Sequence, residues 1–74
     1  MMMTKEEFVE QFSKNLANLI HKEGISVAEL AKEARVSRYT IQKYLSNSET
    51  VIPSAYTIYK LSVIFGCEAD ELLL

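Results

Sequence analysis

The chain is poor in the residues that cross-link or interrupt small folds. Its 74 residues include one cysteine, one proline, two glycines and no tryptophan. The single cysteine, Cys67, excludes an internal disulfide, and one histidine leaves no Cys/His cluster of the kind that holds structural zinc. With so few glycines and prolines and 49% hydrophobic residues, the composition favours one compact all-α domain over residues 1–74 rather than a disordered or fibrous chain.

Other absences concern location and catalysis. No apolar run approaches the roughly 20 residues that span a bilayer, and the first residues lack the hydrophobic core of a signal peptide. We therefore expect a cytoplasmic protein with no membrane partner. There is no glycine-rich phosphate loop, and no serine has a histidine and an acid arranged around it. We expect no enzymatic activity, no cofactor, no metal site and no small-molecule substrate.

Two helix-start signals lie eleven residues apart in the middle of the chain, at Ser26 and Ser37. Ser26 and Glu29 have the spacing of a capping box, in which each side chain accepts a hydrogen bond from the other residue's backbone N–H. Ser37 is an N-cap residue of the same kind. These signals predict helices over residues 27–34 and 38–45, which is the outline of a helix-turn-helix.

The apolar pattern of these two helices predicts a shared core and one wet face. We expect the inward positions to be Ala28, Leu30, Ala31, Ala34, Val36, Ile41 and Leu45. On the second helix this arrangement leaves four larger polar side chains facing outward: Arg38, Tyr39, Gln42 and Lys43.

The outward residue types suit contact with DNA bases. Arginine and lysine pair with guanine edges or phosphates, glutamine can pair with adenine, and tyrosine can touch a thymine methyl group or a phosphate. The helix N-terminus beside Ser37 and Arg38 adds free N–H groups and the positive end of the helix dipole. A plain solvated face is the alternative, but the composition favours contact with double-stranded DNA.

The charge of the chain is unevenly distributed. Ten acidic and eight basic residues give a net charge of −2. Residues 32–48 contain four basic residues and one acid, a local charge of +3, so the remainder carries −5. A basic face on an otherwise acidic protein orients an approaching duplex. This face is smaller, however, than the basic faces of domains that bind DNA tightly. We expect few phosphate contacts per subunit, and hence a need for dimerisation.

Three further helices are predicted outside this motif. A capping box at Thr4 and Glu7 starts a long helix that ends near Glu23, before Gly24. Its expected buried stripe is Phe8, Phe12, Leu16, Leu19 and Ile20. A fourth helix begins around Ser54 and stops at Gly66, with Ile58, Leu61, Ile64 and Phe65 inward, and a short fifth covers residues 68–73. In the irregular stretch between, Asn47 suits the turn that ends the second motif helix.

The segments GIS..ELAKEARVSRYTIQKYLSN and PSAYTIYKLSVIFGCEADELL resemble the phage-repressor and Cro-like helix-turn-helix domains, the XRE family. The resemblance covers nearly the whole chain. It implies a five-helix, lambda-repressor-like fold whose third helix enters the major groove. Arg38 and Tyr39 match positions that read bases, and Gln42 and Lys43 match neighbouring base or phosphate positions. Expected contacts to the DNA backbone are Ser37, Thr40, Ser46, Ser48, Lys32 and Arg35, and a half-buried packing position is the alternative for Thr40.

The chain departs from the family pattern at three places. Val27 stands where the family usually has a polar residue, often glutamine, that forms a hydrogen bond to a phosphate. We therefore expect weaker contact with the DNA backbone on one side of the groove. The loop after Asn47 is about two residues longer than usual and lacks lysine and arginine, which leaves serine and threonine hydroxyls as neutral donors. Glu68 replaces the usual serine or threonine cap of the last helix.

Several apolar residues near the C-terminus lie where the family is frequently polar. They form a possible dimer interface or simply cover the core: Tyr56, Tyr59, Val63, Leu73 and Leu74. The leading hypothesis is a Cro-like repressor that binds a palindromic operator as a homodimer. The alternative is a protein-interaction module or antitoxin-like component that retains the fold, which the net acidity, Val27 and the uncharged loop favour.

Overall fold

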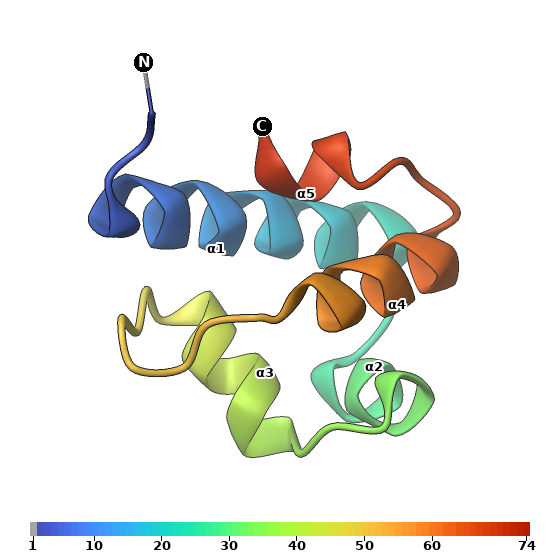
Figure 1. The fold of residues 1–74 in the computed structure, drawn as a ribbon. Coiled ribbons are helices and arrows are strands. Elements are labelled where there is room, and N and C mark those ends of the chain that lie inside the picture. Colours follow the sequence, from blue (N-terminus) through green and yellow to red (C-terminus); the bar gives the residue numbers. More distant parts are fainter. Residues whose placement is uncertain (1) are drawn as a thin grey trace.

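The computed structural model describes residues 2–74 and contains five helices joined by short connections (Figure 1). They are α1 (Lys5–Glu23), α2 (Val27–Ala34), α3 (Arg38–Leu45), α4 (Ala55–Phe65) and α5 (Asp70–Leu73). The predicted all-α, five-helix architecture is confirmed, and α2 and α3 begin and end at the predicted residues.

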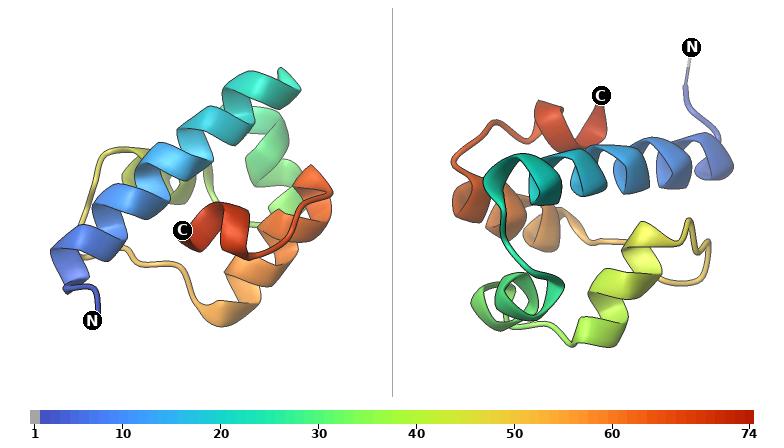
Figure 2. Two further views of the ribbon diagram at one scale, coloured as in Figure 1. Left: turned by 90° about the horizontal axis from the view of Figure 1, so that it is seen from above. Right: turned by 180° about the vertical axis from the view of Figure 1, so that it is seen from behind.

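The helices form an upper and a lower group. Helices α1 and α5 lie side by side along the top of the molecule, while α2 and α3 form the lower part (Figures 1 and 2). Helix α4 joins the two groups because it contacts both α2 and α5, and α3 packs against both α1 and α2. No helix within residues 2–74 is both long enough and apolar enough to cross a membrane.

The helix starts follow from local side-chain chemistry. In the capping box of α1, the Glu7 N–H donates to Thr4 Oγ1 at 3.1 Å, and the Thr4 N–H donates to a Glu7 carboxylate oxygen at 2.8 Å. Ser26 and Glu29 form the second predicted box, at 3.1 and 3.3 Å. These bonds satisfy backbone donors that have no partner inside the helix, which is why each helix begins where it does.

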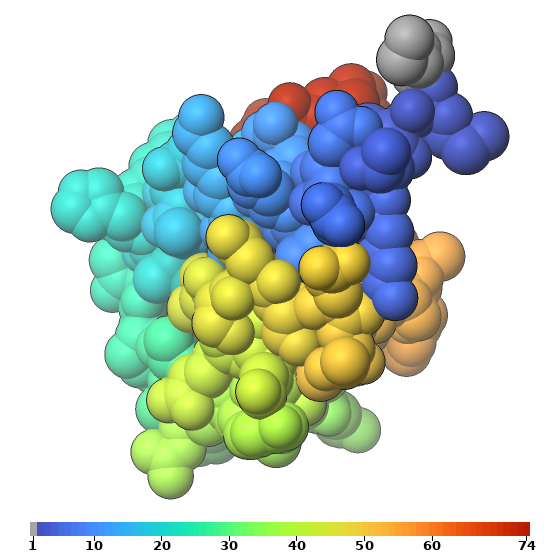
Figure 3. All heavy atoms as spheres, turned by 90° about the vertical axis from the view of Figure 1, so that its left-hand side faces the viewer, coloured from blue at the N-terminus to red at the C-terminus, as the bar shows by residue number. Residues whose placement is uncertain are grey.

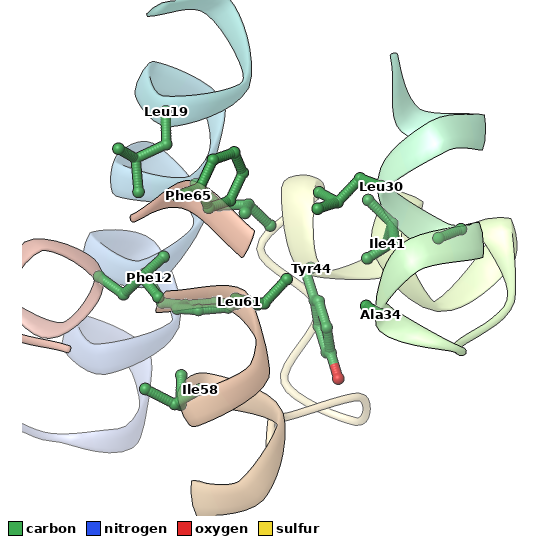
Figure 4. Close-up of a cluster of buried hydrophobic side chains, with 12 residues drawn as sticks. Phe12, Leu19, Leu30, Ala34, Ile41, Tyr44, Ile58, Leu61 and Phe65 are labelled. Carbon is green, nitrogen blue, oxygen red and sulfur yellow. The ribbon is translucent and has the colours of Figure 1, made fainter. Parts of the chain in front are cut away.

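A single core lies between the two groups of helices (Figure 4). Phe12 from α1 meets the edge of the Tyr44 ring from α3, with ring centroids 5.4 Å apart. Tyr44 was not predicted to be buried, because a tyrosine on a half-polar helix is as often exposed. The most completely buried large side chains are Phe12, Leu16, Leu30, Ile41, Leu61 and Leu72.

Some predicted core positions are wrong. Ala28 is exposed, because the buried face of α2 runs through Leu30, Ala31 and Ala34 and the helical rotation carries position 28 away from it. In α1, Val9 is buried, whereas Phe8 is only half-buried, as is Ile20 near the other end of the helix.

The predicted start of the last helix is also wrong. Helix α5 begins at Asp70 rather than at residue 68, and its N-cap position is Ala69, which makes no side-chain cap. Glu68 therefore does not take the place of a serine cap. Instead its carbonyl accepts a hydrogen bond from the Glu71 N–H at 3.0 Å, in the turn that precedes the helix.

Three helix ends are held by side chains from other helices. The Ser13 hydroxyl donates to the carbonyl of Leu45, the last residue of α3, at 2.8 Å, and the Asn15 amide donates to Leu72 O in α5 at 2.9 Å. The Lys60 ammonium donates to the carbonyl of Ala34, at the end of α2, at 2.6 Å. Carbonyls at a helix C-terminus lack partners within the helix, so these bonds both satisfy them and fix neighbouring helices in place.

Candidate nucleic-acid interface

The outer face of α3 lies at one end of the molecule. Figure 3 shows the yellow-green atoms of α3 and the yellow atoms of the following loop as a continuous surface below the blue atoms of α1. Ile41 and Tyr44 hold the helix to the core from its inner side. Because the contacts of α3 are to α1 and α2 on that inner side, its opposite side is open to a ligand.

The four residues predicted to contact bases share this open side. Arg38, Tyr39 and Gln42 are exposed, with 62% of the Tyr39 surface accessible, and Lys43 is half-buried. The Lys43 ammonium lies 5.3 Å from the centre of the Tyr39 ring, one turn earlier on the helix. A cation–π contact of this kind is worth about 0.5–1 kcal/mol at an exposed site, so it favours one arrangement of the two side chains before any ligand binds.

The N-terminus of α3 is free of acidic residues, unlike those of α1 and α2. Ser37 Oγ accepts from the Thr40 N–H at 3.0 Å and lies 2.9 Å from the Thr40 hydroxyl oxygen. When the Thr40 hydroxyl donates to Ser37, the Ser37 proton is left to donate to an oxygen outside the protein. This helix end therefore combines a free hydroxyl donor with the positive end of an uncompensated dipole.

Helix α2 is less suited to holding an anion at its start. The Glu29 carboxylate is tied to the Ser26 N–H there, and Val27 contributes no polar group. Further along α2, Lys32 and Arg35 line a depression together with Glu29 and Glu33. The nearby carboxylates partly offset the charges of Lys32 and Arg35. The electrostatic potential is therefore more positive around Arg38 and Lys43, because α3 has no acidic residue.

Arg35 has a backbone conformation that sequence reasoning missed. Its φ of +57° lies in the left-handed region that favours glycine, and it ends α2. The Arg35 N–H donates to Lys32 O at 3.3 Å and the Val36 N–H donates to Ala31 O at 3.1 Å. These are the two hydrogen bonds of a Schellman turn. A glycine here would have signalled the turn in the sequence, and an arginine gives no such signal.

The hydroxyls of the loop after α3 already have partners. The Ser46 hydroxyl donates to Lys43 O at 3.1 Å, so it must leave that carbonyl to donate elsewhere. Ser48 Oγ accepts from the Thr50 N–H at 3.3 Å and pairs with the Thr50 hydroxyl at 3.0 Å. Asn47, predicted to suit the turn, has a φ of +58° and ends α3 as expected. The structure thus places Ser46 and Ser48 next to α3, with the Ser46 hydroxyl engaged as a donor and one hydroxyl proton of the Ser48–Thr50 pair left free.

The residues predicted for a dimer interface lie on α4, on α5 and at the C-terminus rather than on α3. Tyr56, Tyr59 and Val63 are exposed on α4, and Leu74 is exposed at the C-terminus. Leu73 is half-buried and lines a groove between α4, α5 and the start of α1. The preceding Leu72 belongs wholly to the core.

Comparison with known proteins agrees with this arrangement of two short helices joined by a tight turn. A family model described as a helix-turn-helix domain matches residues 13–74, which include all of α2 to α5 and most of α1. A search of curated proteins and a search of solved structures returned no match. On the family match, and on the two helices that match its motif, the chain belongs to the XRE-type helix-turn-helix family.

Proposed function

We propose that the protein is a sequence-specific DNA-binding transcriptional regulator. Membership of the helix-turn-helix family supports binding to double-stranded DNA. The observation that carries the proposal is the open side of α3, where Arg38, Tyr39, Gln42 and Lys43 stand together on a helix without a single acidic residue.

In this proposal α3 lies in the major groove and its exposed side chains read base edges. Arg38 is in the first turn, where the helix N-terminus comes nearest to the duplex, and its guanidinium suits the O6 and N7 atoms of guanine. Gln42 lies one turn further along and suits adenine. Lys43, held against Tyr39, supplies a cation for a base or for a neighbouring phosphate.

The contacts to the DNA backbone surround these four residues. Ser37 and Thr40 serve the start of α3 and Ser48 its end, through the hydroxyl proton that each serine–threonine pair leaves free, whereas Ser46 gives up its bond to Lys43 O. Lys32 and Arg35 add charge from the α2 side. Because a footprint of this size neutralises few phosphates, we propose that the protein acts as a Cro-like repressor, a homodimer on a palindromic operator.

The proposal predicts that Arg38→Ala loses both affinity and selectivity. On a duplex that the wild-type protein has selected from a random pool, the variant should bind about 1–3 kcal/mol more weakly and lose its preference at one base pair of each half-site. Titration against that duplex and its single-base variants measures both effects. Equal affinity and unchanged selectivity of Arg38→Ala would overturn the assignment of α3 as the reading helix.

A second candidate function is a protein-interaction module or antitoxin-like component. The exposed apolar face of α4 favours it, since large exposed apolar side chains commonly mark contact sites. The two candidates differ in their dependence on α3. If α4 alone carries the function, Arg38→Ala leaves partner binding intact and no duplex is selected.

A further inference from the structure

Lys60 is the only charged residue of α4, and its side chain does not extend freely into water. It is half-buried, and its ammonium donates to the Ala34 carbonyl at 2.6 Å, across 26 residues of sequence. The same ammonium lies 5.0 Å from the centre of the Tyr56 ring, one turn earlier on α4. A lysine side chain gives up much rotamer freedom when it is held in this way, so these contacts distinguish Lys60 from a solvated surface charge.

The carbonyl that Lys60 contacts is buried at the end of α2. Ala34 is the last residue of that helix and none of its surface is exposed, so its carbonyl is shielded from water. Because the helix ends there, no later backbone N–H of α2 can bond this oxygen, and the turn that follows bonds other carbonyls. Lys60 therefore supplies the missing donor, and it adds a positive charge at the negative end of the α2 dipole.

The bond from Lys60 fixes the peptide unit from which the turn begins. The Ala34 carbonyl and the Arg35 N–H belong to one planar unit. Its carbonyl accepts from Lys60 on α4, and its N–H donates to Lys32 O at 3.3 Å, so the unit is held from two sides directly before the Arg35 φ of +57°. A left-handed conformation at a residue other than glycine persists only where its surroundings fix it. The Lys60 bond is therefore one of the contacts that hold this turn.

The turn leads directly into α3. Val36 is the only residue between Arg35 and Ser37, the N-cap of α3. The far end of α3 is fixed by the bond from Ser13 to Leu45 O, so a shift of the turn would tilt the helix about that end. A helix of this length rises about 12 Å, and a tilt of about 10° would move its start by about 2 Å. Because a binding site tolerates displacements of only about 0.5 Å, the position of the turn decides whether the first residues of α3 can make their contacts.

We propose that Lys60 is a positioning residue of the helix-turn-helix, which holds the turn before α3 from α4 and thereby sets where Ser37 and Arg38 meet DNA. Lys60 lines a groove with Glu33 of α2 and Val63 of α4, and no residue of α3 lines that groove. It therefore acts through the turn and not by contact with a base. The effect on DNA binding rests on the function proposed above, whereas the hold on the turn does not.

The first test measures the turn without DNA. Lys60→Met keeps the apolar stem and removes the donor, and Lys14→Met, which changes an exposed lysine of α1, is the matched control. In NMR spectra of Lys60→Met, the carbonyl carbon of Ala34 should shift upfield because it loses its hydrogen bond. The Val36 amide should exchange with solvent about tenfold faster relative to the Leu16 amide in the core. A general loss of stability would speed both amides alike.

Arg35→Gly tests whether Lys60 acts through the strained turn. Glycine adopts this φ without strain, so Lys60→Met should lower the folding equilibrium constant about tenfold in the wild type but only about threefold in Arg35→Gly. Lys60→Arg keeps a charged donor and should retain the wild-type Ala34 carbonyl signal. Lys60→Gln, whose polar end is uncharged and one bond shorter, should behave as Lys60→Met does, and it is the second variant if the methionine variant does not fold.

The second test measures binding to DNA. On a duplex that the wild type has selected, Lys60→Met should bind about fivefold or more weakly, while Lys14→Met and Lys60→Arg should bind nearly as the wild type does. The slope of log affinity against log salt should be the same for all four proteins, because Lys60 makes no phosphate contact that its loss would remove.

Three results would overturn the role of Lys60. One is a Lys60→Met variant with the wild-type Ala34 signal and Val36 exchange rate, and another is an equal cost of Lys60→Met with and without Arg35→Gly. The third is a changed turn with unchanged affinity for the selected duplex, or a salt slope less steep by about 1, which would make Lys60 a phosphate contact. If the turn depends on Lys60 but the wild type binds no duplex, the proposed function is refuted and the hold on the turn stands.

Discussion

Arg35 holds the turn between α2 and α3 in a conformation that costs an L-residue about 1 kcal/mol or more. The Schellman bonds of the turn stabilise that conformation, but they would form equally well with glycine. Since the side chain is not required by the turn, its presence fits a separate role as a cation beside the DNA backbone.

Arg35→Gly should therefore raise stability and lower DNA affinity at the same time. Relief of the strained φ outweighs the extra freedom of glycine in the unfolded chain, and we expect a gain of about 0.5 kcal/mol in the free energy of unfolding, measured by urea denaturation. Binding to all duplexes should weaken alike. The negative slope of log affinity against log salt should become less steep by about 1 for each phosphate contact that is lost.

Arg35→Ala separates the two effects, because it removes the charge but keeps a Cβ atom and therefore the strained φ. It should show the same loss of DNA affinity with no gain in stability. If Arg35→Gly binds DNA as tightly as the wild type at every salt concentration, the residue has no part in phosphate contact.

Cys67 should be a slow nucleophile. Burial is the largest cause of a raised pKa of its thiol. The Glu71 and Glu68 carboxylates raise the pKa further, and the Lys22 ammonium lowers it. A raised pKa keeps the thiolate scarce near neutral pH, and the thiolate is the reactive form. Labelling by iodoacetamide at pH 7–8 should be slower than for free cysteine and should accelerate as pH rises.

Removing a carboxylate near Cys67 should lower the thiol pKa and speed its labelling. Glu71→Gln is the test, and Glu10→Gln, which alters a carboxylate that does not contribute to the Cys67 shift, is the control. A wild-type rate equal to that of free cysteine, or the same rate in Glu71→Gln, would contradict this account of the Cys67 environment.

At the scale of the helices, tertiary hydrogen bonds hold the ends of α2, α3 and α5. Ser13 is buried and its hydroxyl reaches Leu45 O, across 32 residues of sequence. Ser13→Ala should lower the free energy of unfolding by about 1–2 kcal/mol, because a carbonyl at the end of α3 is left without its partner. Thermal or urea denaturation measures the change.

Ser62→Ala provides the comparison for Ser13. Ser62 is equally buried, but its hydroxyl donates at 2.7 Å to Tyr59 O in the interior of α4, where that carbonyl also has a backbone partner within the helix. Its loss should cost less than that of Ser13. Equal costs for the two substitutions would mean that the link between α1 and α3 adds nothing to stability.

The sequence predicts those helix boundaries that depend on neighbouring residues. Thr4 with Glu7 and Ser26 with Glu29 form their boxes within one turn, and Gly24 and Gly66 adopt positive φ values where the helices end. The start of α5 was misplaced because Ala69 has no capping side chain to mark it. The tertiary caps were missed because Ser13, Asn15 and Lys60 lie far along the chain from their acceptors.

In the candidate site, too, the sequence predicts the features that depend on helical periodicity and not those that depend on detailed geometry. The placement of Arg38, Tyr39, Gln42 and Lys43 on one side of α3 follows from helical periodicity and the buried positions between them. The contact between Lys43 and Tyr39, the φ of Arg35 and the internal bonds of Ser46 depend on rotamers and turn geometry, which periodicity does not specify.

At the scale of the whole molecule, two surfaces share one small core. The basic side of α3 and the apolar side of α4 project from different helices, and both helices pack their inner residues into the same cluster. A net charge of −2 keeps non-specific attraction to DNA low, so the proposed recognition depends on the local charge of +3 in residues 32–48.

The most direct test of DNA recognition is selection of bound sequences from a random duplex pool at moderate salt, followed by titration of the selected duplex over a range of salt. The account predicts a palindrome whose half-sites are about one helical turn apart, and about three phosphate contacts per subunit would give a log–log salt slope near −5. Failure of the folded protein to enrich any sequence, or an affinity that does not change with salt, would contradict it.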